Sequence, residues 1–257
     1  MTGDFAGSPF SLQGRTALIT GGGSGLGFAM ASCMARAGAR VAIAGRREEV
    51  LMEACEQLGE NAFPFVFDIR ETGKAEELAA RVHETCGGLD ILVNNAGIHS
   101  KKSFDETLPE DLDALYRVHV SGGFALAQAC VPYMERAGGG SIIWVSSEAA
   151  LVGIPLVNAY SAAKAALLGL TKSLTADLAA RGIRVNVLVP GFIDTPMFRK
   201  ATDSDPERRA KILGHTPMRR FGDPMEIGWA AVYLASPAAS FITGHELVVD
   251  GGFRVGF

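Results

Sequence analysis

Short, β-branched apolar runs alternate with amphipathic helical segments along almost the whole chain. The apolar runs are nearly continuous instead of alternating with polar residues, as is typical of parallel strands that are buried on both faces. The segments between them have the spacing of helices that pack on a sheet. This alternation predicts an α/β fold with one doubly wound parallel sheet and helices on each face. The predicted strands are residues 15–20, 40–45, 62–67, 90–95, 141–147, 183–189 and 245–250, and the clearest helices are 27–38, 48–59 and 74–87.

The chain of 257 residues contains no linker, low-complexity tract or internal repeat that would divide it. We therefore expect a single domain over residues 15–257, preceded by a flexible leader over residues 1–14. Residues 195–222 break the regular pattern because they are polar, interrupted by proline and only partly helical. A long irregular segment after a strand usually covers a site, so we expect this one to cover the substrate; the alternative is a plain surface excursion.

Charge, cysteines and the N-terminal sequence argue against several classes of protein. The net charge of −4 and the lack of a long basic run do not indicate a nucleic-acid-binding protein. No apolar stretch approaches the roughly 20 residues of a membrane helix, and the first residues lack the basic and apolar regions of a secretion signal. The cysteines and histidines are dispersed, so we expect no zinc site and a reducing, cytoplasmic compartment. The thiols expected to be buried or half-buried are Cys33, Cys55, Cys86 and Cys130.

A glycine cluster, TGGGSGLG at residues 20–27, directly follows the first predicted strand and opens the first helix. Gly21, Gly25 and Gly27 are spaced G-x-x-x-G-x-G. Glycines at such a turn let backbone N–H groups and the helix N-terminus approach a pyrophosphate with no Cβ in the way. The position of the cluster therefore predicts a dinucleotide site, although any tight strand-to-helix turn can collect glycine.

A tyrosine and a lysine stand one helical turn apart in NAYSAAK, residues 158–164. Tyr160 and Lys164 are at positions i and i+4, so the phenol and the ammonium share one face of the predicted helix. Ser147 closes a predicted strand 13 residues before the tyrosine. The Tyr–Lys spacing alone fits equally a boundary tyrosine beside a solvated lysine.

Taken together and in this order, several motifs resemble the short-chain dehydrogenase/reductase family. They are TGGGSGLG, NNAG at 94–97, the Ser147–Tyr160–Lys164 spacing, PGFIDT at 190–195 and the closing FITGHELVVDGGF at 241–253. The resemblance implies a nicotinamide-dependent oxidoreductase on a Rossmann-like sheet of about seven strands, usually a homotetramer. Two predicted helices, 108–136 and 158–181, are apolar round much of their circumference and would build that assembly.

The resemblance implies a catalytic set of Ser147, Tyr160, Lys164 and His119. Tyr160 would exchange a proton with the substrate oxygen, because the lysine ammonium and an oxidised nicotinamide both favour the phenolate and lower the tyrosine pKa. Ser147 would hold the substrate oxygen, and Lys164 would also bind the nicotinamide ribose. His119 stands where many members carry an asparagine that helps anchor a water linked to the lysine. It would either relay protons with a pKa of about 6.5, which adds pH sensitivity, or merely pack between helices.

The residue after the second strand selects the cofactor. Arg46 occupies this region, residues 45–47 contain no acid to bind the ribose hydroxyls, and a guanidinium can bind a 2′-phosphate. This favours NADP(H), while NAD(H) stays an alternative because Ser24 stands where a second basic residue is often found. The cofactor-binding residues that the resemblance implies are Gly21, Ser24, Gly25, Leu26, Gly27, Arg46, Asp68, Ile69, Asn95, Ala96, Gly97, Tyr160, Lys164, Pro190, Ile193 and Thr195.

The expected reaction is hydride transfer between nicotinamide and a small carbonyl or secondary alcohol, such as a ketone, a sugar acid or a 3-oxoacyl group. Two alternatives stay open: a nucleotide-binding sensor or scaffold without turnover, and an epimerase or dehydratase, which would normally need a longer C-terminal domain. Basic residues of 195–222 would either attract a carboxylate or acyl carrier or simply be solvated. The expected pocket wall comprises His99, Val152, Gly153, Ile154 and Phe192. No metal, nucleic acid or membrane partner is expected.

Overall fold

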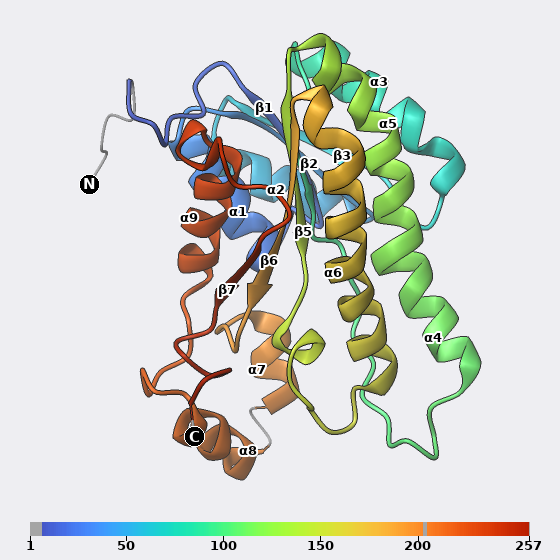
Figure 1. Ribbon diagram of the computed structural model, residues 1–257, viewed down its shortest axis with the longest axis vertical. Coiled ribbons are helices and arrows are strands. Elements are labelled where there is room, and N and C mark those ends of the chain that lie inside the picture. The colour runs from blue at the N-terminus through green and yellow to red at the C-terminus, as the bar shows by residue number, and fades with distance from the viewer. Residues whose placement is uncertain (1–6, 203–204, 257) are drawn as a thin grey trace.

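The seven predicted strand runs form one parallel sheet. The fold was obtained as a computed structural model that describes residues 7–202 and 205–256. The strand order is β3-β2-β1-β4-β5-β6-β7, and every neighbouring pair is parallel. The prediction of a doubly wound Rossmann-like sheet is therefore confirmed (Figure 1). The strands are β1 Thr16–Thr20, β2 Arg40–Gly45, β3 Ala62–Val66, β4 Ile91–Asn94, β5 Gly140–Val145, β6 Ile183–Pro190 and β7 Glu246–Val249.

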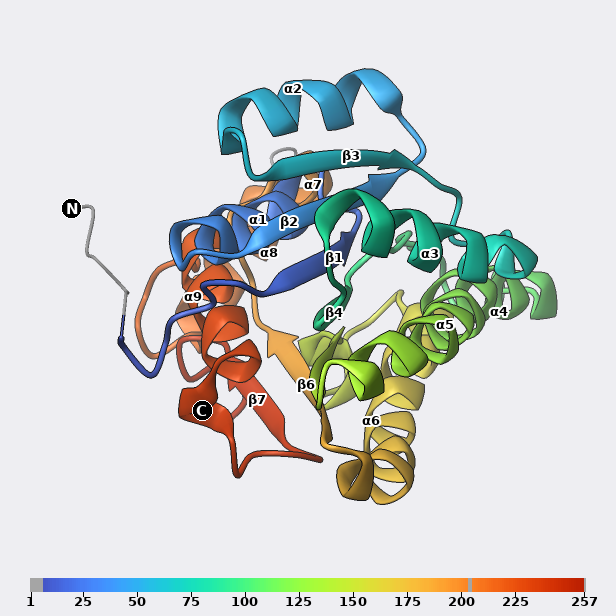
Figure 2. The same ribbon diagram turned by 90° about the horizontal axis from the view of Figure 1, so that it is seen from above.

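Helices cover both faces of the sheet and bury two separate apolar layers (Figure 2). One layer joins the sheet to helices α1 Gly25–Arg36, α2 Glu48–Leu58 and α9 Pro224–Ala235. The other joins it to α3 Ala75–Cys86, α5 Gly123–Arg136 and α6 Asn158–Leu178. Central strands such as β1 are buried along their whole length, which explains why their sequences are continuously apolar.

The strand order reverses between β1 and β4, since β1 pairs with β2 on one side and with β4 on the other. In open α/β sheets, ligands bind in the crevice at the carboxyl ends of the strands at such a switch point. A long helical segment lies next to it: α4 Pro109–Tyr116 continues through a π-helical turn, Arg117–Gly122, into α5. The topology thus fixes where a site should be sought.

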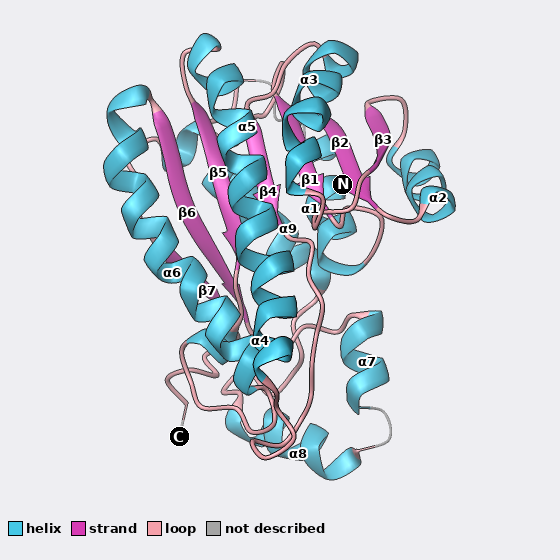
Figure 3. Cartoon of the chain, turned by 90° about the vertical axis from the view of Figure 1, so that its right-hand side faces the viewer, coloured by secondary structure: helices cyan, strands magenta, loops and turns pink. Residues whose placement is uncertain are grey.

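Residues 195–222 are partly helical, as expected. They contain α7 Pro196–Thr202 and α8 Pro206–His215, which lie beyond the ends of the strands (Figure 3). Residues 203–204 between them are outside the described part of the chain.

The second half of the predicted leader packs against the domain. Leu12 is 1% exposed and its N–H donates to the Ala37 carbonyl at 2.8 Å. Pro9 accepts a backbone hydrogen bond from Ala238. Residues 1–6 of the leader lie outside the described residues, so its flexibility stays a prediction.

The cysteine prediction is confirmed. Cys33, Cys86 and Cys130 are buried free thiols and Cys55 is half-buried. Burial raises the pKa of each thiol, which keeps them protonated. Among the described helices, none combines the length and apolar character needed to cross a membrane.

Candidate active site

The glycine turn after β1 exposes its backbone, and its conformation and close contacts leave no room for larger residues. Gly21 and Gly25 have φ values of +67° and +55°, which favour glycine. A Cβ on Gly27 would lie 2.2 Å from the Gly21 carbonyl oxygen, so only glycine fits there. The first turn of α1 contains no acidic side chain. The partial positive charge at the N-terminus of the helix is therefore not neutralised by the helix itself. This cradle suits a pyrophosphate.

A cleft of about 1040 Å³ extends from the glycine turn to α6. It brings together most of the predicted site. The predicted residues that line it are Gly21, Ser24, Gly25, Leu26, Gly27, Arg46, Asp68, Ile69, Asn95, Ala96, Gly97, His119, Tyr160, Lys164 and Thr195.

Three predicted residues do not line this cleft. Pro190 is buried and pairs with Val249 in the sheet, and Ile193 is 6% exposed and packs in the core. Ser147 does not line the cleft, but its side chain lowers the pKa of the Tyr160 phenol. The side chains of Pro190 and Ile193 are buried, so any contact of these two residues with a ligand would have to be made by their backbone.

The end of the cleft next to β2 and β3 holds an ion pair that the sequence did not predict. The Arg70 Nε donates to both oxygens of Asp68 at 3.0 Å. Arg70 lowers the pKa of Asp68 to about 2, with a smaller contribution from the charge of Arg46. The only signal in the sequence is a basic residue two positions past Asp68. Arg46, Arg47 and Arg70 all line this end of the cleft, and the charges of Arg70 and Arg46 act on Asp68.

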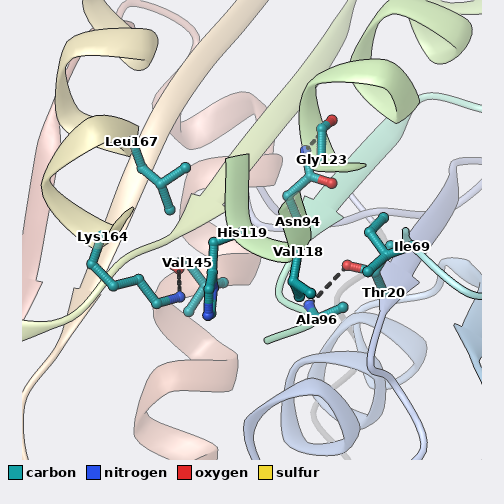
Figure 4. Close-up of a pocket in the computed structure, with 10 residues that line it drawn as sticks. All are labelled: Thr20, Ile69, Asn94, Ala96, Val118, His119, Gly123, Val145, Lys164 and Leu167. Atoms are coloured by element: carbon teal, nitrogen blue, oxygen red, sulfur yellow. Dashed lines mark hydrogen bonds between the residues drawn. The ribbon is translucent and has the colours of Figure 1, made fainter. Parts of the chain in front are cut away.

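The helix α6 places Tyr160 and Lys164 at the opposite end of the cleft. The Lys164 Nζ donates to the Val145 carbonyl oxygen at 2.7 Å and lies 5.6 Å from the centroid of the Tyr160 ring. The neighbouring Ser146 is buried, and its Oγ donates to the Lys164 carbonyl oxygen at 2.9 Å. This bond ties the end of β5 to α6 and leaves Ser147, not Ser146, beside the phenol (Figure 4 shows Lys164 and Val145).

The expected lowering of the Tyr160 pKa is not found. Burial raises the pKa of the phenol to about 12, and the hydrogen bond with Ser147 opposes this only in part. Burial also lowers the pKa of Lys164 to about 7. The physical reason is desolvation: Lys164 is buried and Tyr160 is half-buried at the cleft, which disfavours the charged form of each. The ammonium lies over the Tyr160 ring and donates to the Val145 carbonyl.

His119 lies in the π-helical turn and is 5% exposed. Its Nε2 is 2.8 Å from the Ile98 carbonyl oxygen, and its ring meets the Tyr160 ring edge-on with centroids 5.6 Å apart. Burial and then the positive charge of Lys164 lower its pKa to about 3. The expected pH sensitivity near 6.5 is therefore wrong, because a buried imidazole beside an ammonium stays neutral.

The expected pocket wall is assembled in part. The His99 ring lies 5.0 Å from the Tyr160 ring, and Phe192 packs against Phe253 at 4.8 Å. Burial, then the charges of Arg208 and Lys101, lower the pKa of His99.

Two of the basic side chains in residues 195–222 are neutralised locally. Arg199 forms an ion pair with Asp194, and Arg220 forms one with Glu226. Arg209 stacks over the Phe221 ring at 4.8 Å. The positive charges of Arg208 and Lys101 act on His99, whose ring lies 5.0 Å from the Tyr160 ring.

The comparisons with known proteins agree over nearly the whole chain. A family model described as enoyl-(acyl carrier protein) reductase matches residues 21–254. An uncharacterized oxidoreductase of Thermotoga maritima is 43% identical, covering 94% of this chain and 98% of its own. A 3-oxoacyl-[acyl-carrier-protein] reductase of the same organism is 38% identical, covering 95% and 99%. The crystal structure of a gluconate 5-dehydrogenase from Burkholderia cenocepacia, in complex with NADP and tartrate, superposes with a TM-score of 0.92 at 37% identity, covering 98% of this chain and 100% of that one.

Proposed function

The chain belongs to the short-chain dehydrogenase/reductase family, and from this premise we propose how its residues divide the work of catalysis. The protein is an NAD(P)(H)-dependent oxidoreductase that transfers a hydride between nicotinamide and a carbonyl or secondary alcohol of a small-molecule substrate. The observation that carries the assignment of roles is the cluster of Ser147, Tyr160 and Lys164 at one end of a cleft whose other end is a glycine cradle.

Tyr160 exchanges the proton with the substrate oxygen. When bound, the nicotinamide supplies or accepts the hydride and, in its oxidised form, brings a positive charge beside the phenol. Ser147 donates a hydrogen bond to the same substrate oxygen and orients it toward Tyr160. Lys164 holds its ammonium 5.6 Å from the ring centroid, where it would favour the phenolate against the opposing effect of burial, and it would also bind the nicotinamide ribose.

The cofactor fits the residues that are present. The pyrophosphate would lie on the turn of Gly21, Gly25 and Gly27, where added Cβ atoms would clash or strain the backbone. Arg46 would bind a 2′-phosphate, which supports NADP(H) over NAD(H). Arg70 is held by Asp68, so it supplies less free charge than Arg46. Asn95, Ala96, Gly97 and Thr195 would enclose the nicotinamide half.

A substrate that carries an acid group is the best supported class. Two of the relatives above are named for such substrates, a gluconate 5-dehydrogenase and a 3-oxoacyl-[acyl-carrier-protein] reductase. In this chain, the charge of Arg208 acts on His99, whose ring contacts Tyr160. A carboxylate or acyl-carrier phosphate at the mouth of the cleft would meet this positive charge.

A homotetramer on α4, α5 and α6 is proposed as the working assembly. Exposed apolar side chains gather on and just before α4: Phe104, Leu108, Leu112 and Tyr116 are 82%, 55%, 37% and 39% exposed. Patches of this kind usually mark a protein interface.

The test is a panel of carbonyl compounds and secondary alcohols, each assayed with both cofactors by nicotinamide absorbance. It should include neutral ketones, sugar acids and 3-oxoacyl thioesters. We expect turnover with at least one acidic substrate. Tight cofactor binding, measured by fluorescence, without turnover of any compound would instead favour a nucleotide-binding sensor.

A further inference from the structure

His119 connects three parts of the active site. It belongs to the π-helical turn Arg117–Gly122, it bonds to the backbone of Ile98 in the loop after β4, and its ring meets the Tyr160 ring edge-on at 5.6 Å. The loop residues 95–98 and the histidine all line the cleft. Figure 4 shows the imidazole beside Lys164. A movement of this ring would therefore displace both the loop 95–98 and the Tyr160 ring.

The hydrogen bonds of the ring do not suit proton relay. A neutral imidazole relays by giving a proton from one nitrogen while it accepts one at the other. The Nε2 lies 2.8 Å from the Ile98 carbonyl oxygen, and the Ile98 N–H points toward the same nitrogen at 3.3 Å. These two contacts need opposite tautomers, and we infer the one with the proton on Nε2, because the shorter contact is to an oxygen that can only accept. An amide carbonyl accepts a hydrogen bond but does not take up a proton, so transfer through Nε2 ends there.

The loop is shaped to fit the ring. A Cβ on Gly97 would lie 2.4 Å from the His119 Cε1 and 3.1 Å from its Nδ1. Contacts below 3.0 Å force a shift, and the buried ring has little room to move. The absence of a side chain on Gly97 therefore makes room for the His119 ring, and the two residues pack closely together.

We propose that His119 is a positioning residue that fixes the loop 95–98 and the Tyr160 ring, and that it does not carry the catalytic proton. The inference rests on the proposed function, because it concerns the same site. His119 then acts as a neutral N–H donor, whereas the resemblance would make it a proton relay. The cofactor side of the site then depends on one hydrogen bond from His119 to Ile98.

Two substitutions separate positioning from relay. His119→Gln keeps a neutral N–H donor near the position of Nε2 but has no imidazole, whereas His119→Phe keeps a ring and has no donor. We expect the Gln variant to keep the cofactor Kd within about threefold and to leave the shape of the pH profile of kcat unchanged. We expect the Phe variant to raise the cofactor Kd about tenfold, the factor that corresponds to one lost hydrogen bond. His83→Gln, the same change on α3 at a ring that contacts Tyr133 at 4.8 Å, is the matched control.

A Gln variant with strongly reduced kcat and an unchanged cofactor Kd would overturn the proposal in favour of a relay. A Phe variant equal to the wild type in both constants would show that the ring only fills space. If the Phe variant does not fold, nitrogen NMR of the wild-type histidines decides. We expect a neutral ring with the proton on Nε2 from about pH 5 to pH 8; titration in this range, or a proton on Nδ1, would refute it. Cofactor binding and NMR need no turnover, so the inference can fail or stand independently of the substrate assignment.

Discussion

Glu148, the residue after Ser147, should make the stability of the protein fall as the pH rises. Its side chain is 2% exposed, and neither oxygen of its carboxyl group has a hydrogen-bond partner among residues 7–202 and 205–256. Burial, and then the charge of the neighbouring Asp250, raise its pKa from 4.5 to about 7, although Arg254 opposes this shift. The folded protein therefore prefers the protonated form of this group.

The sign and size of the effect follow from linkage. Because the folded pKa is raised above the unfolded value, the folded state holds one more proton than the unfolded state between about pH 4.5 and pH 7. The free energy of unfolding should decrease by about 1.4 kcal/mol per pH unit in this window, or about 3 kcal/mol in total. This contribution is fully present below the unfolded pKa and is lost as the pH rises through the folded one.

Glu148→Gln keeps the shape of the side chain and cannot ionise. We expect it to be close to wild type in stability at about pH 4 and more stable by up to about 3 kcal/mol at about pH 8. The measurement is urea unfolding of both proteins at a series of pH values and one protein concentration, so that all other titrating groups cancel in the difference. Glu84→Gln on the exposed face of α3 controls for the substitution itself. A difference between wild type and E148Q that does not change with pH would refute the reasoning.

Three further predictions concern catalysis, cofactor choice and assembly. Tyr160→Phe should lower kcat at least about a hundredfold and leave the cofactor Kd nearly unchanged, because only the hydroxyl is removed; activity within about threefold of wild type would contradict the assignment. Arg46→Ala should weaken NADP(H) binding by about 1.5–3 kcal/mol and NAD(H) binding much less, as measured by the dissociation constants of both cofactors at fixed ionic strength. Equal losses would mean that Arg46 only stacks on adenine, and a wild-type preference for NAD(H) would show the choice to be wrong. Light scattering at micromolar concentration should give the mass of four chains, and a clean single-chain mass would rule out the tetramer.

The parts of the site that the sequence predicted are those set by local spacing. Tyr160 and Lys164 share a face because they are one turn apart on α6, whatever packs around them. The glycine turn follows from its place between β1 and α1. Arg70 was not predicted because its role depends on its ion pair with Asp68 at the cleft. A basic residue shortly after a predicted strand does not by itself indicate such a pair.

The sequence by itself determined how strands and helices succeed one another along the chain. Strands that are buried on both faces and helices that pack on a sheet differ in the spacing of their apolar residues. It also determined the glycine cradle and the Tyr–Lys pair, which are short-range features. Only the tertiary structure decided the electrostatic state of the site. The neutral His119 and the raised pKa values of Tyr160 and Glu148 all result mainly from burial. Burial is the sum of contacts from segments far apart in the chain: Ile98 with His119, Val145 with Lys164, and Asp250 with Glu148. Since desolvation of a charge depends on all of these neighbours together, no local pattern could have predicted its outcome.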